Sequence, residues 1–512
     1  MMGFTFFQEH SVFPWFNGEQ GFFRGYVYDE QNKRLVDEEA WNWVNAQLNQ
    51  GRYALNGAFA FVRKDTDAWL LLADVCRSFP ILFSHQSSGW NIGDDGWSMK
   101  ENLGLRKDED QAFHFESFSF CLHHATPWKG LSQIQAGEVV VLNDNGSMRV
   151  SEYAAMNHSP LNFEQANRAM MNRLLNEKIS GNYVVPLSGG WDSRHLLANL
   201  VHAGVKNVVT YTYGHPDSSE VKTAQSIAQQ LNVKNYFVHY TPDLLDQMWE
   251  GKGSEFLRYA SQGIAAPQEQ EFFALLHLTQ QGHINKGDVI LPGYCGDLPA
   301  GSYVMSDVNP KHQATEKAIR RWIKDRHLVY ARGTQMEETL LNTIYALLEP
   351  SNDMTFAEWN EVHERWFIKE KVSKYVLNGL RTFEFFGLEW RIPLWDAEWL
   401  AYSYGCTFEQ RKNRSHFKRQ CNALLFEPLQ ISHAIYDKPN DFMAQLKMAV
   451  KEVIPSQWLL KWTQLRFKAA DLDNTNGGHL VSVMRKKGVK TMNWPSTSVN
   501  PYLAAHMWQS MD

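Results

Sequence analysis

The feature that most restricts the fold is a short apolar run at residues 183–187, which leads through Ser188-Gly189-Gly190 into a helical pattern from Trp191. Further predicted strands at 207–213 and 236–239 flank a second helical pattern. Strands that alternate with helices are typical of a parallel sheet covered by helices on both faces. The sequence therefore predicts an α/β domain whose first strand ends in a glycine turn.

A chain of 512 residues is too long for one domain. Short alternating runs at 21–28, 59–63, 69–73, 113–120 and 138–142 are separated by turn residues, which predicts a mostly antiparallel β domain before the α/β domain. From about residue 310 the pattern is mainly helical. We expect three parts, residues 1–155, 156–440 and 441–512, the last a helical extension.

Charge and cysteine content exclude several classes of protein. The 50 Lys and Arg against 56 Asp and Glu give a net charge of −6, so no basic field favours nucleic acid or an anionic membrane. No apolar stretch is long enough to span a bilayer, and the start, with Glu9 and His10, lacks a secretory pattern. The five cysteines form no CxxC pair. We expect a reduced, cytoplasmic protein with small-molecule partners; a homodimer is compatible with the sequence.

The Ser188-Gly189-Gly190 turn is suited to an anion. A helix that begins after a strand presents free backbone N–H groups and the positive end of its dipole, and glycines let a phosphate approach closely. The alternative is a tight turn in which Asp192 and Ser193 are ordinary first-turn residues. Because a carboxylate repels polyphosphate unless a divalent cation bridges them, a working phosphate site with Asp192 implies Mg²⁺. Asp217 and Glu220 are expected to cap the next helix.

The stretch from Pro186 to Arg194 resembles the SGG-x-DS pyrophosphatase loop of the asparagine synthetase-like amide ligases, which form a carboxyl–AMP anhydride and release pyrophosphate. The resemblance implies an ATP site with Mg²⁺. The ATP-binding residues it assigns are Leu187, Ser188, Gly189, Gly190, Asp192, Ser193, Tyr213 and Gly293.

Three further matches follow in the order that the family shows. The stretch from Pro292 to Tyr303 is similar to the second metal loop, with Asp297 as the metal-binding partner of Asp192. Residues 389–396 resemble the E-x-R-x-P-x-x-D segment, where Glu389 and Arg391 are either functional or a structural ion pair. Lys418 and Lys438 stand where the family has two lysines that contact phosphate and the reacting carbonyl.

Residues 55–61 and 73–80 resemble the glutaminase domain of the family, which implies an α+β N-terminal domain of the Ntn type beside the α/β ATP-pyrophosphatase domain. Glutamine-hydrolysing members have an N-terminal cysteine, and Met2 stands in its place here. A thioether cannot attack an amide. We therefore expect no glutaminase activity, and the amine must come from elsewhere.

The resemblance leaves two branches of the family open. In β-lactam synthetase-like members the residue at Tyr294 belongs to a Tyr–Glu dyad that deprotonates the amine, but the stretch at 376–379 supplies no glutamate. Residues 188–194, 210–214 and 375–396 look more like the corresponding stretches of members encoded in surface-polysaccharide gene clusters. We expect adenylation of a uronic acid and its coupling to an amino acid or ammonia, with Lys438, Lys418 and Tyr294 as catalytic residues. The alternatives are an intramolecular cyclase of the β-lactam synthetase or lasso-peptide type and a scaffold with a dead nucleotide site.

Overall fold

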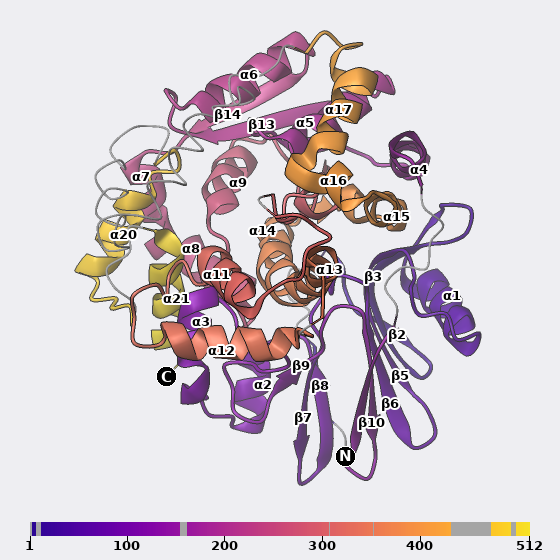
Figure 1. Ribbon diagram of the computed structural model, residues 1–512, viewed down its shortest axis with the longest axis vertical. Helices are drawn as coiled ribbons and strands as arrows, with labels where there is room; N and C mark the ends of the chain where they lie inside the picture. The colour runs from indigo at the N-terminus through magenta and orange to yellow at the C-terminus, as the bar shows by residue number, and fades with distance from the viewer. Residues whose placement is uncertain are drawn as a thin grey trace.

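The computed structural model describes residues 3–6, 12–153, 161–306, 308–351, 353–431, 473–492 and 498–511. Within them, an N-terminal part built on two β-sheets packs against a larger part built on one parallel sheet and many helices (Figure 1). Met2 and Lys438, which the sequence singles out, lie outside the described residues.

The N-terminal part contains two sheets whose pairings are antiparallel, except for the parallel pair β1–β8. The smaller sheet has the order β1 (Gly3–Thr5), β8 (Gly89–Gly93), β7 (Leu82–Gln86) and β9 (Ser132–Gln133). The larger has the order β11 (Met148–Glu152), β10 (Glu138–Asn143), β6 (Ala68–Ala73), β5 (Gly57–Lys64), β3 (Gly21–Tyr28) and β2 (Phe16–Gly18), with β4 (Arg34–Leu35) also beside β3.

Alternation along β5 explains why the larger sheet is covered on both faces. Phe59 and Phe61 point to one face, where Phe61 stacks on Trp41 of α1 (Asp37–Asn49) with ring centroids 4.7 Å apart. Ala60 and Val62 point to the other face and join the core that includes the smaller sheet. Successive side chains of a strand alternate between faces, so one apolar strand serves both cores.

The second part is built on a five-stranded sheet in which every pairing is parallel, as predicted. Its order is β14 (Lys234–His239), β13 (Val208–Gly214), β12 (Tyr183–Pro186), β15 (Val289–Ile290) and β16 (Glu389–Trp390). The chain runs outward from β12 to β14 and then returns to the other side of β12 as β15. Ligands in such sheets bind outside the carboxyl ends of the strands at this reversal.

Helices and the loops between them form the remainder of the described chain. Those that follow or precede the parallel strands are α4 (Phe163–Asn176), α5 (Trp191–His202), α6 (Ser219–Gln230), α7 (Pro242–Asp246), α8 (Lys252–Ser261) and α9 (Gln270–Gln280). After β15 come α10 (Asp297–Ala300), α11 (Glu316–His327), α12 (Glu337–Leu348), α13 (Phe356–Phe367), α14 (Leu380–Phe385), α15 (Ala397–Gly405), α16 (Phe408–Arg411), α17 (Ser415–Cys421), α20 (Gly477–Lys486) and α21 (Val499–Gln509). The remaining helices, α2 (Gly96–Leu103) and α3 (Ala112–Phe118), belong to the N-terminal part.

One predicted strand is wrong, because residues 113–120 begin in helix α3 rather than in a strand. The alternating phenylalanines suggest period two, but Phe115 and Phe118 are also spaced for one helix face. Phe115 packs against Trp508 of α21, with ring centroids 5.6 Å apart, and the yellow α21 lies beside α3 in Figure 1. A contact with a residue so far along the chain is not visible in the local pattern.

The described part of the chain contains neither a membrane-spanning helix nor a disulfide bond. None of its helices combines the length and apolar character that a membrane crossing needs. All five cysteines are free thiols, and four of them are buried.

Candidate active site

The turn between β12 and α5 is held by its own serines. The backbone N–H of Gly190 donates to Ser188 Oγ at 3.1 Å, and that of Ser188 donates to Ser193 Oγ at 3.2 Å. Gly190 is the N-cap of α5 in extended conformation, and a β-carbon there would lie 3.1 Å from Ser188 Oγ. The missing side chain leaves the backbone at the helix start open to an anion.

A second glycine loop, between β15 and α10, packs directly on this turn. A β-carbon on Gly293 would lie 3.0 Å from the Ser193 nitrogen, and one on Gly296 would lie 2.8 Å from the carboxyl carbon of Asp192. Asp297 begins α10, and its Oδ1 accepts a hydrogen bond from Ser302 Oγ at 2.7 Å. The two loops therefore meet where the strand order reverses.

Asp192 and Asp297 share one cation, Arg414. Nη1 of Arg414 lies 3.6 Å from Asp192 Oδ2, and its Nη2 pairs with Asp297 Oδ1. Burial and then the charge of Asp297 raise the pKa of Asp192 to about 7, while Arg414 opposes the shift. The other oxygen of Asp192, Oδ1, is buried without a hydrogen-bond partner in the described structure.

These carboxylates fit a magnesium ion. Mg²⁺ commonly binds one or two carboxylates and completes its shell with phosphate oxygens and water. Asp192 and Asp297 supply such a pair, and the unpartnered Oδ1 of Asp192 is an oxygen that a cation would satisfy. The described residues bring together no group of three or more His, Cys, Asp or Glu suited to a metal, so a cation here would need further ligands from outside the protein.

A cavity of about 270 Å³ opens beside the two loops. Its wall contains eight of the residues singled out from the sequence: Leu187, Ser188, Gly190, Asp192, Ser193, Tyr213, Gly293 and Tyr294. Among the other lining residues are Thr212, Glu220, Gln270, Glu271, Asn474 and Thr475. The structure thus brings the strand ends, the start of α9 and a C-terminal segment to one place.

The predicted capping of α6 by Asp217 and Glu220 is wrong, and Asn474 is a residue of the cavity that the sequence did not single out. Ser218, not Asp217, caps α6, because its side chain accepts from the N–H of Glu220. The carboxyl of Glu220 instead lines the cavity and accepts from Asn474 Nδ2 at 3.4 Å. Asn474 is fixed by the N–H of His215, which donates to its Oδ1 at 3.0 Å.

Tyr294 lies where the sequence places the amine base, without an adjacent glutamate. Its hydroxyl is 3.1 Å from the position of a β-carbon on Gly379, so the stretch at 376–379 does pack against it. Its ring contacts Phe383, with centroids 6.1 Å apart. Burial and then the charge of Glu271 raise the pKa of Tyr294 well above its usual value. The carboxyl whose charge affects Tyr294 therefore belongs to α9.

Lys418 lies outside the cavity wall. Its Nζ is 5.6 Å from the ring centroid of Trp191, the first residue of α5, so the charge is close to the helix start. Lys438 lies outside the described residues. Arg414, which stands four residues before Lys418, is the nearby cation that sequence reasoning missed, and nothing in its basic surroundings distinguishes it.

Glu389 and Arg391 form a structural ion-pair cluster. Arg391 is buried, and its Nη2 lies 2.8 Å from Glu177 Oε2 and 3.0 Å from Glu389 Oε2. Arg34 of the N-terminal part also contacts Glu389, at 3.1 Å. Neither Glu389 nor Arg391 lines the cavity beside the loops. The segment joins the two parts of the chain.

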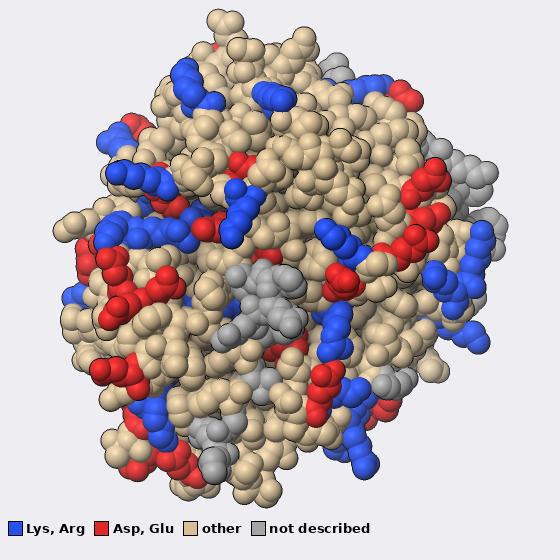
Figure 2. All heavy atoms as spheres, turned by 180° about the vertical axis from the view of Figure 1, so that it is seen from behind, with Lys and Arg blue, Asp and Glu red and all other residues tan. Residues whose placement is uncertain are grey.

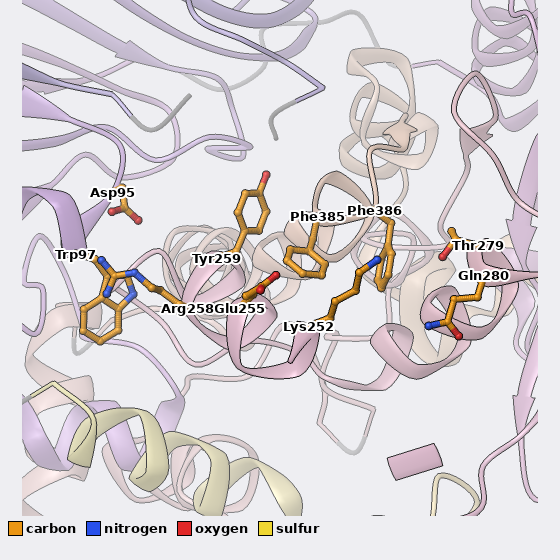
Figure 3. Close-up of a pocket in the computed structure, with 10 residues that line it drawn as sticks. All are labelled: Asp95, Trp97, Lys252, Glu255, Arg258, Tyr259, Thr279, Gln280, Phe385 and Phe386. Carbon is orange, nitrogen blue, oxygen red and sulfur yellow. The ribbon is translucent and has the colours of Figure 1, made fainter. Parts of the chain in front are cut away.

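A larger cavity, of about 570 Å³, lies at the opposite end of α9 (Figure 3). Thr279 and Gln280 contribute from that end, and Phe385 and Phe386 form an aromatic wall. Its Arg258 already pairs with Glu101 at 2.7 Å. Because neither glycine loop reaches it, size does not make this cavity the better candidate for the chemistry.

Comparison with known proteins shows the family of the second part of the chain. Residues 178–428 match the family model described as asparagine synthase, which spans both glycine loops and Lys418. No curated protein matches the chain significantly.

Solved structures similar to the chain include three enzymes. The NH3-dependent NAD synthetase from Campylobacter jejuni is 14% identical, with a TM-score of 0.21, over 40% of this chain and 93% of that one. The glutamine-dependent NAD(+) synthetase from Cytophaga hutchinsonii is 12% identical, with a TM-score of 0.19, over 46% and 55%. The glutamine phosphoribosylpyrophosphate amidotransferase from B. subtilis is 11% identical, with a TM-score of 0.18, over 67% and 77%.

Proposed function

Residues 178–428 form a domain of the asparagine synthase family, which makes the chain an AMP-forming carbon–nitrogen ligase, and from this premise we propose its substrates and site. The ligase adenylates a uronic acid and couples it to ammonia or an amino acid in surface-polysaccharide biosynthesis. The observation that carries the assignment of the site is the meeting of the two glycine loops, which sets Asp192 beside Gly296 at the start of α5.

The first step is adenylation. An oxygen of the substrate carboxylate attacks the α-phosphorus of ATP, and the bond from that phosphorus to the bridging oxygen breaks, so that pyrophosphate leaves. The Ser188-Gly189-Gly190 turn and the start of α5 hold the phosphates through backbone N–H groups. Asp192 and Asp297 would hold Mg²⁺, which would neutralise charge on the phosphates.

The second step is amide formation. The amine nitrogen attacks the carbonyl carbon of the acyl-adenylate, and the carbon–oxygen bond to AMP breaks. We assign Lys438 to the developing negative charge and Lys418 to pyrophosphate; a preorganised cation in such a place contributes a few kcal/mol, on the order of 3. Tyr294 orients the amine from the cavity wall.

The N-terminal part does not hydrolyse glutamine in this proposal. Its described thiols, Cys76 and Cys121, are both fully buried, and burial raises the pKa of each far above the usual range. A thiol that stays protonated and enclosed is no nucleophile. We retain the division into a glutaminase-like domain at 1–155, a synthetase domain at 156–440 and an extension at 441–512.

The partners are small molecules. On the face that Figure 2 shows, small groups of Lys and Arg alternate with small groups of Asp and Glu. Such a surface offers little attraction to a polyanion. A reduced cytoplasmic location and a homodimer remain part of the proposal.

Exchange of radioactive pyrophosphate into ATP tests the proposal. Purified protein with Mg²⁺ should exchange label only when a uronic acid is present, and mass spectrometry should then find a uronamide after ammonium or an amino acid is added. A product that is cyclic and arises without added amine would replace the ligase assignment by a cyclase. Absence of exchange with every uronate and nucleotide-sugar uronate would contradict it.

A further inference from the structure

Glu271 is a buried carboxyl that faces the cavity beside the glycine loops. It stands in the first turn of α9 and is only 7% exposed, yet it belongs to the lining. Two tyrosines of β13 donate to it: the Tyr213 hydroxyl to Oε1 at 3.3 Å and the Tyr211 hydroxyl to Oε2. Of these two, Tyr213 also lines the cavity.

The surroundings of Glu271 are aromatic and acidic. Tyr211 and Tyr213 face it from β13, Tyr240 follows β14, and Tyr294 comes from the loop after β15. Burial, and then the charge of Glu271, raises the pKa of all four. The described residues place no Lys, Arg or His in the cavity wall. Burial raises the pKa of Glu271 to about 7, and the tyrosine hydrogen bonds oppose the shift.

Stabilisation of α9 does not explain why Glu271 stands in its first turn. An acidic residue in a first helical turn stabilises the helix through the dipole when it is exposed and ionised. Glu271 is instead desolvated, which favours its neutral form and works against that interaction. A carboxyl held close to half-ionisation near neutral pH, in contact with a cavity, is suited to receiving a proton.

We propose that Glu271, through the hydroxyl of Tyr213, accepts the proton that the amine loses during amide formation. This inference rests on the proposed function. The nitrogen forms its bond to the carbonyl carbon, and the bond to AMP breaks with its electron pair on the phosphate oxygen. One N–H proton passes to the Tyr213 oxygen, whose own proton moves to Oε1 of Glu271.

The assignment also defines the class of amine. Glu220 and Glu271 set two carboxyls in the wall next to the phosphate-binding turn. A neutral amine, ammonia or a primary alkylamine, adds no negative charge to these two groups, and its nitrogen loses one proton towards Glu271 as the amide forms. The cavity therefore takes a small amine without a second negative charge, and free ammonia is preferred over an acidic amino acid.

Glu271→Gln tests the proposal, with Glu269→Gln as the matched control. Glu269 is also buried, and burial raises its pKa to about 7, but it does not line the cavity. The probes are glucuronic acid with either ammonium chloride or hydroxylamine, which is mostly uncharged and strongly nucleophilic at neutral pH. Glu271→Gln should lower amide formation from ammonium about 100-fold or more, while hydroxamate formation and pyrophosphate exchange change less than about threefold.

The pH profile adds a readout that a structural role would not move. Since Glu271 accepts the proton only when ionised, the wild-type rate at a constant concentration of free ammonia should rise with pH through about 7, and Glu271→Gln should lose that inflection. An equal loss of exchange, hydroxamate and amide in Glu271→Gln, or the same loss in Glu269→Gln, would overturn the assignment. Absence of uronate-dependent exchange in the wild type would overturn the proposed function itself.

Discussion

Gly296 lies so close to Asp192 that a β-carbon on Gly296 would be 2.8 Å from the aspartate carboxyl carbon. The same β-carbon would be 2.7 Å from Leu394 Cδ1, so it would clash on both sides. Gly296→Ala should therefore displace Asp192 and lower pyrophosphate exchange by at least about tenfold, with a stability loss of about 1–3 kcal/mol. Exchange assays and urea unfolding measure the two effects. If Gly296→Ala exchanged pyrophosphate at the wild-type rate, Asp192 would not act from this position.

Arg414 should compete with a metal for the two aspartates. Because its guanidinium pairs with both Asp192 and Asp297, Arg414→Ala should raise the affinity for Mn²⁺ without nucleotide by about tenfold, or roughly 1.4 kcal/mol. Calorimetric titration of Mn²⁺ measures this. Arg419→Ala is the control, since the structure pairs Arg419 with His416 instead. Unchanged or weaker Mn²⁺ binding in Arg414→Ala would contradict the shared role of the two carboxylates.

Arg391 should matter for stability rather than for chemistry. Arg391→Met removes the paired cation of the buried Glu177 carboxyl and leaves it with the Tyr28 hydroxyl, which should cost about 3–5 kcal/mol in the free energy of unfolding. Glu389→Gln is the comparison, because its side chain is 39% exposed and its loss should cost less than about 1 kcal/mol. Urea unfolding measures both, and pyrophosphate exchange by the folded Arg391→Met protein should persist. Loss of exchange in a fully folded variant would instead favour a functional Arg391.

His195 should make the protein sensitive to acid. It is fully buried, with Nε2 2.9 Å from Asn167 Oδ1, and burial lowers its pKa from 6.5 to about 3. The unfolded chain therefore binds a proton at His195 that the native state does not bind. As a result, the free energy of unfolding decreases as pH falls below 6.5. The contribution between pH 6.5 and pH 5 is about 2 kcal/mol.

The matching variant is His195→Gln, which cannot take up that proton. Its unfolding free energy should fall by about 2 kcal/mol less than that of the wild type between neutral pH and pH 5. Urea unfolding at the two pH values measures the difference. Parallel losses in the two proteins would exclude His195 as a source of the sensitivity.

The parallel sheet and its first glycine turn could be predicted because their signals are local. An apolar strand, a Ser-Gly-Gly turn and a helix start are adjacent in sequence, and β12 and α5 form at those residues. The convergence of Asp192 with Asp297 required the family resemblance, since spacing alone does not say that β15 pairs with β12.

Other parts of the site depend on contacts that no local pattern contains. Glu271 resembles an ordinary first-turn acid until the tyrosines of β13 are placed beside it. Arg414 is one of several nearby basic residues until it reaches Asp192. The same limit explains the wrong strand at residues 113–120, where a partner in α21 decides the conformation.

The contribution of Asn474 and Thr475 to the cavity wall has a consequence for biosynthesis of the protein. Both glycine loops, α5 and α9 emerge from the ribosome long before residue 474, but the wall that they share with Asn474 does not exist until then. Since domains begin to fold during synthesis, this cavity is completed only at a late stage. A nascent chain thus holds an incomplete pocket, and adenylation should begin only after nearly the whole polypeptide has been made.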